Sequence, residues 1–300
     1  MKSLERTSEA RLTAPALFIA VLAISFAAIF FRKAEPTHPL VAAGIRLAVA
    51  AIVLLPLTVR SIAAGRVHRR LVESAVAAGF LYGLHFGAWV TSLTLTTVAA
   101  SVTLVTTTPL LLAIVGTVTG RDRPGRRLWV SLALAFVGLA FIGGADLTLG
   151  SGVLLGDALA LLGAAAMASY LIVGRRLGDS MDLWAFSGIA TAVGAAVLLG
   201  GANLLGVPIR AASTEALVYL VLAALLPQLV GHNLLTWSLR HTTPSVVGMA
   251  VVGEPVGATI LGWIILGETI RFPVGAGCAI TIAAVILAIR SQRAIRTPYT

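Results

Sequence analysis

Three side chains that can bind and release protons lie in apolar stretches of the sequence. They are His85 in LYGLHFGAWV, His232 in LVGHNLLTW and Glu254 in VVGEPVG. Imidazole and carboxylate groups can act as general acids and bases, bind metals, carry protons or hold charged ligands. No HExxH, CxxC or GxxxxGKS motif accompanies them in a usable context. We therefore predict no catalytic residue, no metal and no cofactor, and keep an intramembrane enzyme or a channel only as the weaker alternatives.

Two aromatic residues share a helix face with the first of these histidines. Tyr82, His85 and Trp89 follow i, i+3, i+7 spacing, which places them on one side of a helix. A second stripe on the same helix consists of small residues that allow close packing of a neighbour, namely Gly79, Gly83 and Gly87. The aromatic face then remains for a cavity. The alternative is that Tyr82 and Trp89 only pack, and that His85 is hydrogen-bonded to a neighbour.

The stretch around the second histidine is rich in polar groups. It contains Pro227, Gln228, His232, Asn233 and Trp237. Pro227 removes a backbone hydrogen bond and is expected to bend the helix. Gln228, His232 and Asn233 can both donate and accept hydrogen bonds, which suits a zwitterionic ligand. The alternative for these side chains is hydrogen bonding between helices.

Hydroxyl groups gather before a proline in another apolar run. The residues on one face are Thr103, Thr106 and Thr107, shortly before Pro109. Such hydroxyls either bond back to a carbonyl three or four residues earlier, or form a wall that contacts a ligand. Ser169 and Tyr170 are further candidates for lining the cavity.

Three charged residues also interrupt apolar segments. Glu254 stands directly before Pro255, and a buried charge must be paired, neutralised or hydrated. Its possible roles are proton coupling, binding of a substrate amine, or structural pairing with an Arg or His. Arg46 is interpreted as a structural charge that snorkels or pairs with a carboxylate, with a role on a substrate carboxylate as the alternative. Asp157 is interpreted as a cap at a helix N-terminus.

The composition places all these groups in a membrane protein. Of the 300 residues, 58% are apolar and 11% are charged, whereas soluble domains carry about 25% charged residues. The net charge of +10 does not indicate nucleic-acid binding, because the basic residues lie in short gaps between apolar runs. The expected fold class is an all-α polytopic membrane protein.

Ten apolar runs are long enough to cross a bilayer as helices. They are residues 12–31, 38–57, 71–92, 98–119, 128–144, 154–174, 182–200, 215–237, 244–266 and 272–290. Of the 22 Lys and Arg residues, 17 lie in connections on one side, 4 on the other, and Arg46 within a span. The positive-inside rule then predicts that both termini are cytoplasmic.

One segment of the sequence occurs twice. SLTLTTVAASVTLVTTTP at 92–109 returns as SLRHTTPSVVGMAVVGEP at 238–255, with six identities in register. The copies lie on the fourth and ninth predicted spans, so they cross the membrane in opposite directions. We therefore predict two inverted five-helix repeats, residues 1–148 and 149–300. Such repeats place a binding site near mid-membrane between them. Within this segment, Glu254 replaces Thr108 of the first copy. Each copy ends on a proline, and Pro109 and Pro255 are expected to break their helices.

Several stretches resemble a known family. They are PLVAAGIRLAVAA with Pro39 and Arg46, Trp89 followed by SLTLTTVAAS, TPLLLAIVG at Pro109, GDALALLGAAAMASYLIVGRRL, and EPVGATILGWIILGET. In their order and spacing they resemble the EamA family of the drug/metabolite transporter superfamily, and most of all its aromatic amino-acid exporters. The resemblance implies two five-helix repeats. One departure is Gly-Arg-Asp at 120–122, where the second repeat has Leu-Gly-Glu at 266–268.

The expected function is export of amino acids or related small metabolites across the bacterial inner membrane. The chain would be a secondary transporter that works by alternating access, since no ATP-binding motif is present. Aromatic cavity candidates favour substrates with an apolar or aromatic side chain. The alternative is a multidrug exporter of the same fold, with Glu254 as its essential carboxylate. The expected partners are a small-molecule substrate and the lipid bilayer, with no nucleic acid, and the protein is expected to be a monomer.

Overall fold

The computed structural model describes residues 2–96, 98–121, 123–143, 151–267 and 269–294, and within these ranges all regular structure is helical. The helices of the first half are α1 (Lys2–Lys33), α2 (Pro39–Ala63), α3 (Arg69–Leu95), α4 (Val98–Val105), α5 (Thr108–Thr119) and α6 (Arg126–Gly143). Those of the second half are α7 (Ser151–Leu177), η2 (Gly178–Ser180), α8 (Leu183–Leu204), α9 (Thr214–Ala223), η3 (Ala224–His232), α10 (Asn233–Ser238), α11 (Pro244–Val251), α12 (Glu254–Leu266) and α13 (Phe272–Ala294). The prediction of an all-α fold is confirmed.

Eight helical segments in the described part of the chain are long and apolar enough to cross a membrane. The two remaining predicted spans correspond to α6 and α13, which are also helices. The apolar part of α13 is short, from Phe272 to Ala288, and α6 begins with two arginines. Length and composition therefore identify eight candidate spans among the described residues, and the predicted count of ten is not confirmed.

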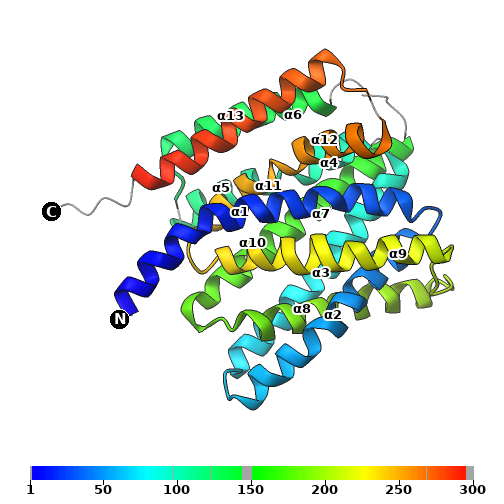
Figure 1. Ribbon diagram of the computed structural model, residues 1–300, viewed down its shortest axis with the longest axis horizontal. Helices are drawn as coiled ribbons and strands as arrows, with labels where there is room; N and C mark the ends of the chain where they lie inside the picture. Colours follow the sequence, from blue (N-terminus) through cyan, green and yellow to red (C-terminus); the bar gives the residue numbers. More distant parts are fainter. Residues whose placement is uncertain (1, 97, 122, 144–150, 268, 295–300) are drawn as a thin grey trace.

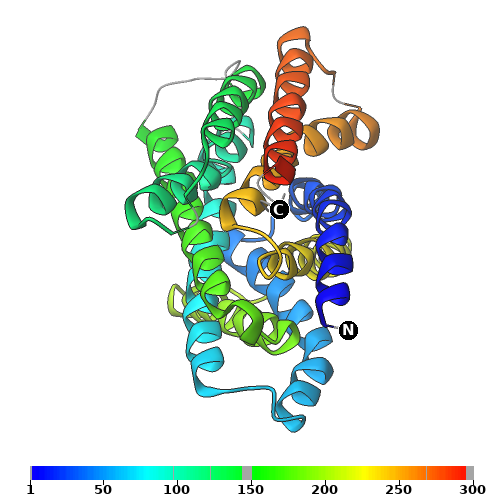
Figure 2. The same ribbon diagram turned by 90° about the vertical axis from the view of Figure 1, so that its left-hand side faces the viewer.

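The two halves of the chain are interleaved. Helices α6 and α13 lie side by side at one edge of the molecule, and α2 packs on α8 at the other (Figure 1). Helix α3 contacts both α7 and α8, and the end-on view shows the same arrangement (Figure 2). The beginning of α1 and the end of α13 lie at the same end of the molecule (Figure 1). The predicted boundary between residues 148 and 149 falls outside the described residues.

Both copies of the duplicated segment form interrupted helices. Helix breaks were expected at Pro109 and Pro255, and in the structure α4 ends at Val105 and α11 ends at Val251. Pro109 and Pro255 stand four residues later, and a proline has no N–H to donate to the carbonyl four residues before it. Each lies in the first turn of the next helix. The interruptions fall at matching positions, 146 residues apart, so the repeat is also a structural one.

The segment around Pro227 is irregular, as the sequence predicted. Residues Ala224 to His232 form a π-helical segment, η3, between α9 and α10. A π-helical turn contains an extra residue and changes the direction of the side chains that follow it. Its counterpart in the first half, α3, is an uninterrupted α-helix of 27 residues. The two halves therefore differ at this point.

The glycine stripe of α3 packs closely on α8, which confirms the predicted role of small residues. A Cβ atom placed on Gly79 would lie 2.8 Å from the carbonyl oxygen of Ala190, and one on Gly83 would lie 3.3 Å from that of Gly194. Only glycine allows two helix backbones to approach this closely. This contact fixes α3 in rotation, so that its opposite face, with Tyr82, His85 and Trp89, turns toward α7 and the interior.

Candidate functional site

A small buried cavity of about 40 Å³ lies between α1, α2, α3, α7, α10 and the two interrupted helices. Its polar lining residues come from both halves of the chain: Arg46, His85, Thr106, Thr108, Tyr170, His232, Thr236 and Glu254. Its apolar lining includes Phe86 and Trp89. Six of the predicted candidates (His85, Trp89, Thr106, Tyr170, His232 and Glu254) are thus brought together around one space.

Arg46 is the most deeply placed charge at this cavity. Its side chain is fully buried, with 0% exposed surface, so the expected snorkelling to the membrane surface does not occur. Its Nη2 donates a hydrogen bond to Oε1 of Gln228 at 3.0 Å. The guanidinium carbon lies 4.4 Å from the ring centre of Phe86, a distance at which a cation is attracted to the ring face. The burial of Arg46 is therefore partly compensated by an amide and an aromatic ring.

Two nitrogens of this guanidinium have no partner among the described residues. The Nε and Nη1 atoms of Arg46 are buried, and neither donates a hydrogen bond to an acceptor among the described residues. Buried donors without acceptors are energetically costly. Nε and Nη1 lie on different edges of the planar guanidinium, so each can donate a single hydrogen bond to an oxygen of an anion. Arg46 thus has the geometry of an anion-binding group at the cavity.

Glu254 brings the opposite charge to the same cavity. It lies in the first turn of α12, where the positive end of the helix dipole favours a carboxylate. It lines the cavity together with Arg46, yet no ion pair joins the two side chains in the described part of the chain. A cation and an anion on separate walls of one cavity can each bind a group of the opposite charge.

The two histidines differ in how they are held. Nδ1 of His85 lies 2.9 Å from the carbonyl oxygen of Gly163, and since a carbonyl only accepts, Nδ1 is the donor. His85 therefore makes the hydrogen bond to a neighbour that the alternative interpretation predicted, and it also lines the cavity. His232 packs its ring edge-on against Tyr82 and Phe86, with ring centres 5.6 and 5.4 Å apart. His85 is therefore positioned by the backbone of α7, and His232 by aromatic rings of α3.

Behind the cavity lies a layer of stacked aromatic rings. Tyr82 and Tyr170 stack with ring centres 4.5 Å apart, and Tyr82 accepts a hydrogen bond from Nε2 of Gln228 at 2.9 Å. The Tyr170 hydroxyl bonds to the Thr236 hydroxyl at 3.0 Å. Tyr82 and Gln228 therefore act on the cavity through Arg46 and Tyr170, rather than lining it themselves.

The predicted threonine wall forms only in part. Thr106 lines the cavity, but its hydroxyl donates to the carbonyl of Val102 at 2.8 Å. Thr107 donates to the carbonyl of Leu104 at 2.7 Å, and neither Thr103 nor Thr107 lines the cavity. Bonding back to the helix backbone, the alternative interpretation, describes Thr106 and Thr107.

Four other candidates lie outside the lining of this cavity. Ser169 bonds back to the carbonyl of Ala165 at 2.9 Å. Asn233 is buried, and Trp237 packs on His241 with ring centres 4.3 Å apart. Asp157 was expected at a helix N-terminus, but α7 already begins at Ser151. Asp157 instead accepts a hydrogen bond from the Thr96 hydroxyl at 3.0 Å, so it ties α7 to the end of α3.

The sequence interpretation missed several lining residues, among them Phe86 and Thr108. Phe86 lies next to His85 and lines the cavity under the Arg46 guanidinium. Thr108 bonds to the carbonyl of Val105 at 3.0 Å, which provides one hydrogen bond that Pro109 cannot. The signal for Thr108 was its position, since it matches Glu254 in the second copy.

Comparisons with known proteins agree with this architecture. A sequence profile of the EamA-like transporter family matches residues 12–144 and 154–290, once in each half. Among solved structures, one crystal structure of a protein aligns with a TM-score of 0.74 over 94% of this chain and 98% of that chain. At 17% sequence identity, that likeness shows the fold alone. A search of curated proteins finds no match in sequence. Because the family profile covers nearly the whole of both halves, the chain belongs to the EamA-like transporter family.

Proposed function

We propose that this membrane transporter exports amino acids with apolar or aromatic side chains through the buried cavity. The observation that supports this proposal is the placement of Arg46 and Glu254 on the walls of one cavity. A guanidinium suits a substrate carboxylate, and a carboxylate suits a substrate ammonium group. Phe86 and Trp89 offer aromatic surface for an apolar side chain. A zwitterion would therefore meet its complement at each end.

The size of the cavity favours a transport cycle with more than one conformation. A volume of about 40 Å³ holds a few water molecules, whereas ligand sites commonly occupy roughly 300–1,000 Å³. The cavity must therefore expand to accept an amino acid. The interruptions after Val105 and Val251 divide two helices at the cavity into short halves, and short halves can move separately. These features support alternating access.

The proposed orientation rests on the distribution of basic residues. We propose that α6 and α13 cross the membrane in addition to the eight long apolar segments, which would give ten spans and place most arginines on the cytoplasmic side. We infer that both termini are cytoplasmic and that the protein resides in a bacterial inner membrane. Such a protein is driven by gradients, with Glu254 as the candidate for proton coupling.

The multidrug alternative is disfavoured by Arg46. Multidrug exporters that take organic cations need an aromatic cavity and a carboxylate, which are present here. A fully buried guanidinium on the same cavity repels such cations, because charges interact strongly at short range in a poorly solvated interior. Arg46 instead favours substrates that carry a carboxylate.

Counterflow into proteoliposomes tests the proposal directly. The purified protein would be screened against the twenty amino acids, with and without a proton gradient. We expect counterflow of an apolar or aromatic amino acid, and no counterflow of the matching amine or of the matching acid without its amino group. Arg46→Gln and Glu254→Gln should each abolish counterflow. Arg60→Gln, which changes an exposed arginine on the same helix as Arg46, is the control and should leave counterflow unchanged. Uptake of organic amines in preference to amino acids would refute the proposal, and an unchanged proton dependence in Glu254→Gln would exclude its role in coupling.

A further inference from the structure

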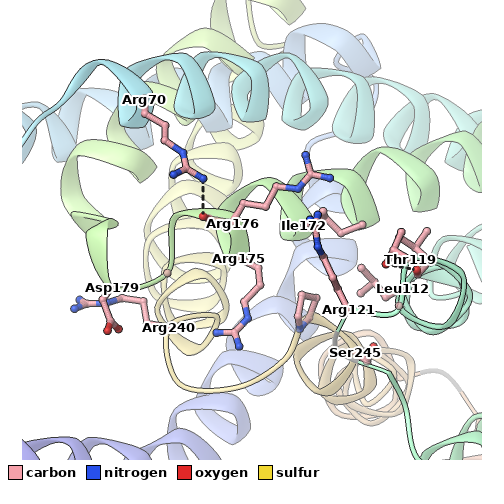
Figure 3. A pocket seen from close by; sticks show the side chains of 14 residues that line it. Arg70, Leu112, Thr119, Arg121, Ile172, Arg175, Arg176, Asp179, Arg240 and Ser245 are labelled. Carbon is pink, nitrogen blue, oxygen red and sulfur yellow. Dashed lines mark hydrogen bonds between the residues drawn. The ribbon is translucent and has the colours of Figure 1, made fainter.

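A second and much larger cavity lies near the end of the molecule where the arginines gather. Its volume is about 890 Å³, and it is enclosed by α5, α7 and the connection from α10 to α11 (Figure 3). Its charged lining consists of Arg70, Arg121, Arg175, Arg176, Arg240 and Asp179. Five arginines and one aspartate give this lining a formal charge of +4. We call this cavity the arginine vestibule.

The positive-inside rule alone does not explain this convergence. That rule requires basic residues in the cytoplasmic connections, but it does not require them to face one another. The five arginines come from α3, the end of α5, the end of α7 and the end of α10, and Figure 3 shows them directed around one space. A concave site lined with one sign of charge concentrates counter-ions.

Backbone carbonyls hold two of these arginines in place. Arg70 donates from Nη2 to the carbonyl oxygen of Arg176 at 3.3 Å (Figure 3), and Arg175 donates from Nη1 to that of Leu239 at 2.9 Å. A carbonyl has no net charge, so these bonds position a guanidinium without neutralising it. In addition, Nε of Arg240 is buried and has no hydrogen-bond partner among the described residues. The vestibule is thus a cationic site in which backbone hydrogen bonds fix the positions of Arg70 and Arg175.

Apart from Thr119, Ser245 and two glycines, the rest of the vestibule wall is apolar. Leu112 and Val115 of α5, Ile172 of α7 and Pro244 of α11 contribute to it. A small hydrated anion such as phosphate gains nothing from such a wall. An organic acid with an apolar body can place its carboxylate among the arginines and remove apolar surface from water.

The vestibule ends close to the buried cavity. Leu112 lines the vestibule and Thr108 lines the cavity, and four residues of α-helix correspond to about 6 Å along the axis. On α7, Ile172 lines the vestibule and its neighbour Leu171 lines the cavity. A layer of about one helical turn therefore separates the two spaces.

We propose that the arginine vestibule is a second binding site, which takes the carboxylate of an apolar organic acid one helical turn away from the buried cavity. The site recognises the acid group through its arginines and the body of the ligand through α5 and α7. That an amino acid captured here through its carboxylate is then exported rests on the function proposed above. The binding step itself does not.

Binding to the detergent-purified full chain tests this inference. The probe is 3-phenylpropionate, an apolar carboxylate without an amino group, measured by isothermal titration calorimetry. We expect binding that weakens as salt rises and that weakens roughly tenfold or more in Arg121→Gln and in Arg240→Gln. The lysine variants of both positions should restore part of it. Arg60→Gln, an exposed arginine outside the vestibule, should bind as the unchanged protein does. Arg46→Gln should also keep binding, because Arg46 belongs to the buried cavity.

Several results would overturn the inference. Wild-type affinity in Arg121→Gln and Arg240→Gln would place the probe elsewhere. Equal affinity for inorganic phosphate would mean a general anion site. Binding of short-chain phosphatidylglycerol in place of the probe would mean a lipid headgroup site. If Arg121→Gln and Arg240→Gln both bind the probe normally while amino-acid counterflow persists, the vestibule site is refuted and the proposed function is not. Probe binding to the vestibule without amino-acid counterflow would refute only the proposed function.

Discussion

At the scale of single residues, the cavity is organised around one buried cation. Arg46 donates to Gln228, Gln228 donates to Tyr82, and Tyr82 stacks on Tyr170. Removing one member of such a buried network leaves its partner unpaired, which is more costly than the bond itself is favourable. Gln228 therefore holds Arg46 in position while leaving its positive charge available for a ligand.

Replacing the amide of Gln228 by a carboxylate should lower transport without lowering thermal stability. In Gln228→Glu, the new carboxylate pairs with Arg46 and accepts from the Tyr82 hydroxyl, so we expect unchanged or higher thermal stability. The same pairing neutralises Arg46, so transport of a carboxylate substrate should fall by at least tenfold. Gln228→Leu should lower both, because Arg46 loses its acceptor. Intrinsic fluorescence on heating and counterflow measure the two effects, and full transport in Gln228→Glu would contradict the proposed role of Arg46.

Two tryptophans that looked alike in the sequence should now behave differently. Trp89 lines the cavity, whereas Trp237 packs on His241 outside it. We expect Trp89→Ala to reduce export strongly and Trp237→Ala to leave the rate close to that of the unchanged protein, at equal expression. Export assays on cells with quantified membrane protein compare the pair. Equal losses in both variants would mean that the transport path extends beyond this cavity.

The difference between these two residues shows what the sequence could and could not predict. The face with His85 and Trp89 was predictable because α3 is a regular helix whose glycine stripe fixes its rotation. Trp237 follows the π-helical segment, where regular spacing no longer tells which way a side chain points. The bond from Arg46 to Gln228 joins residues 182 positions apart, so no local pattern could reveal it.

At the scale of elements, close contacts between helices position the site. The glycines of α3 bring it against α8, and Gly163 of α7 lies against His85 and Trp89. The positions of the helices were predictable from apolar length. The breaks at Pro109 and Pro255 were predictable, because a proline lacks the N–H that continues the helix. The residues at which α4 and α11 end were not, because a proline does not state whether the helix bends or ends.

A pair of glycine substitutions tests this packing. A Cβ on Gly79 would lie 2.8 Å from a backbone oxygen of α8, whereas a Cβ on Gly200 would meet nothing within 4 Å. We expect Gly79→Ala to lower the melting temperature and the transport rate, because α3 and α8 must separate. Gly200→Ala should be neutral or slightly stabilising, since alanine favours helix by about 1 kcal/mol over glycine. Equal melting temperatures for the two variants would show that the helices do not pack as described.

At the scale of the whole molecule, neither half can form the site alone. Arg46, His85 and Thr108 come from the first half, and Tyr170, His232 and Glu254 from the second. The duplication was visible in the sequence because the two copies share a register. Its interleaved packing was not visible, because it depends on contacts such as α3 on α8 and α6 on α13.

The number of spans can be decided by a fusion between the halves. If α6 crosses the membrane, alkaline phosphatase fused after Thr148 lies outside the cytoplasm and is active. If α6 does not cross, the same fusion is inactive. We expect activity at this position, and a fluorescent protein fused after Thr300 should fluoresce in the cytoplasm. An inactive Thr148 fusion at normal expression would contradict the proposed crossing of α6.

The matching interruptions have one electrical consequence. Of the two breaks, only the second has an ionisable side chain, Glu254, where the first has Thr108. A change of conformation that moves an ionised Glu254 along the membrane normal displaces charge in the membrane field. One elementary charge carried across 100 mV corresponds to about 2.3 kcal/mol. The membrane potential would then shift the balance between the conformations of the empty protein, so that voltage itself becomes an input to the cycle.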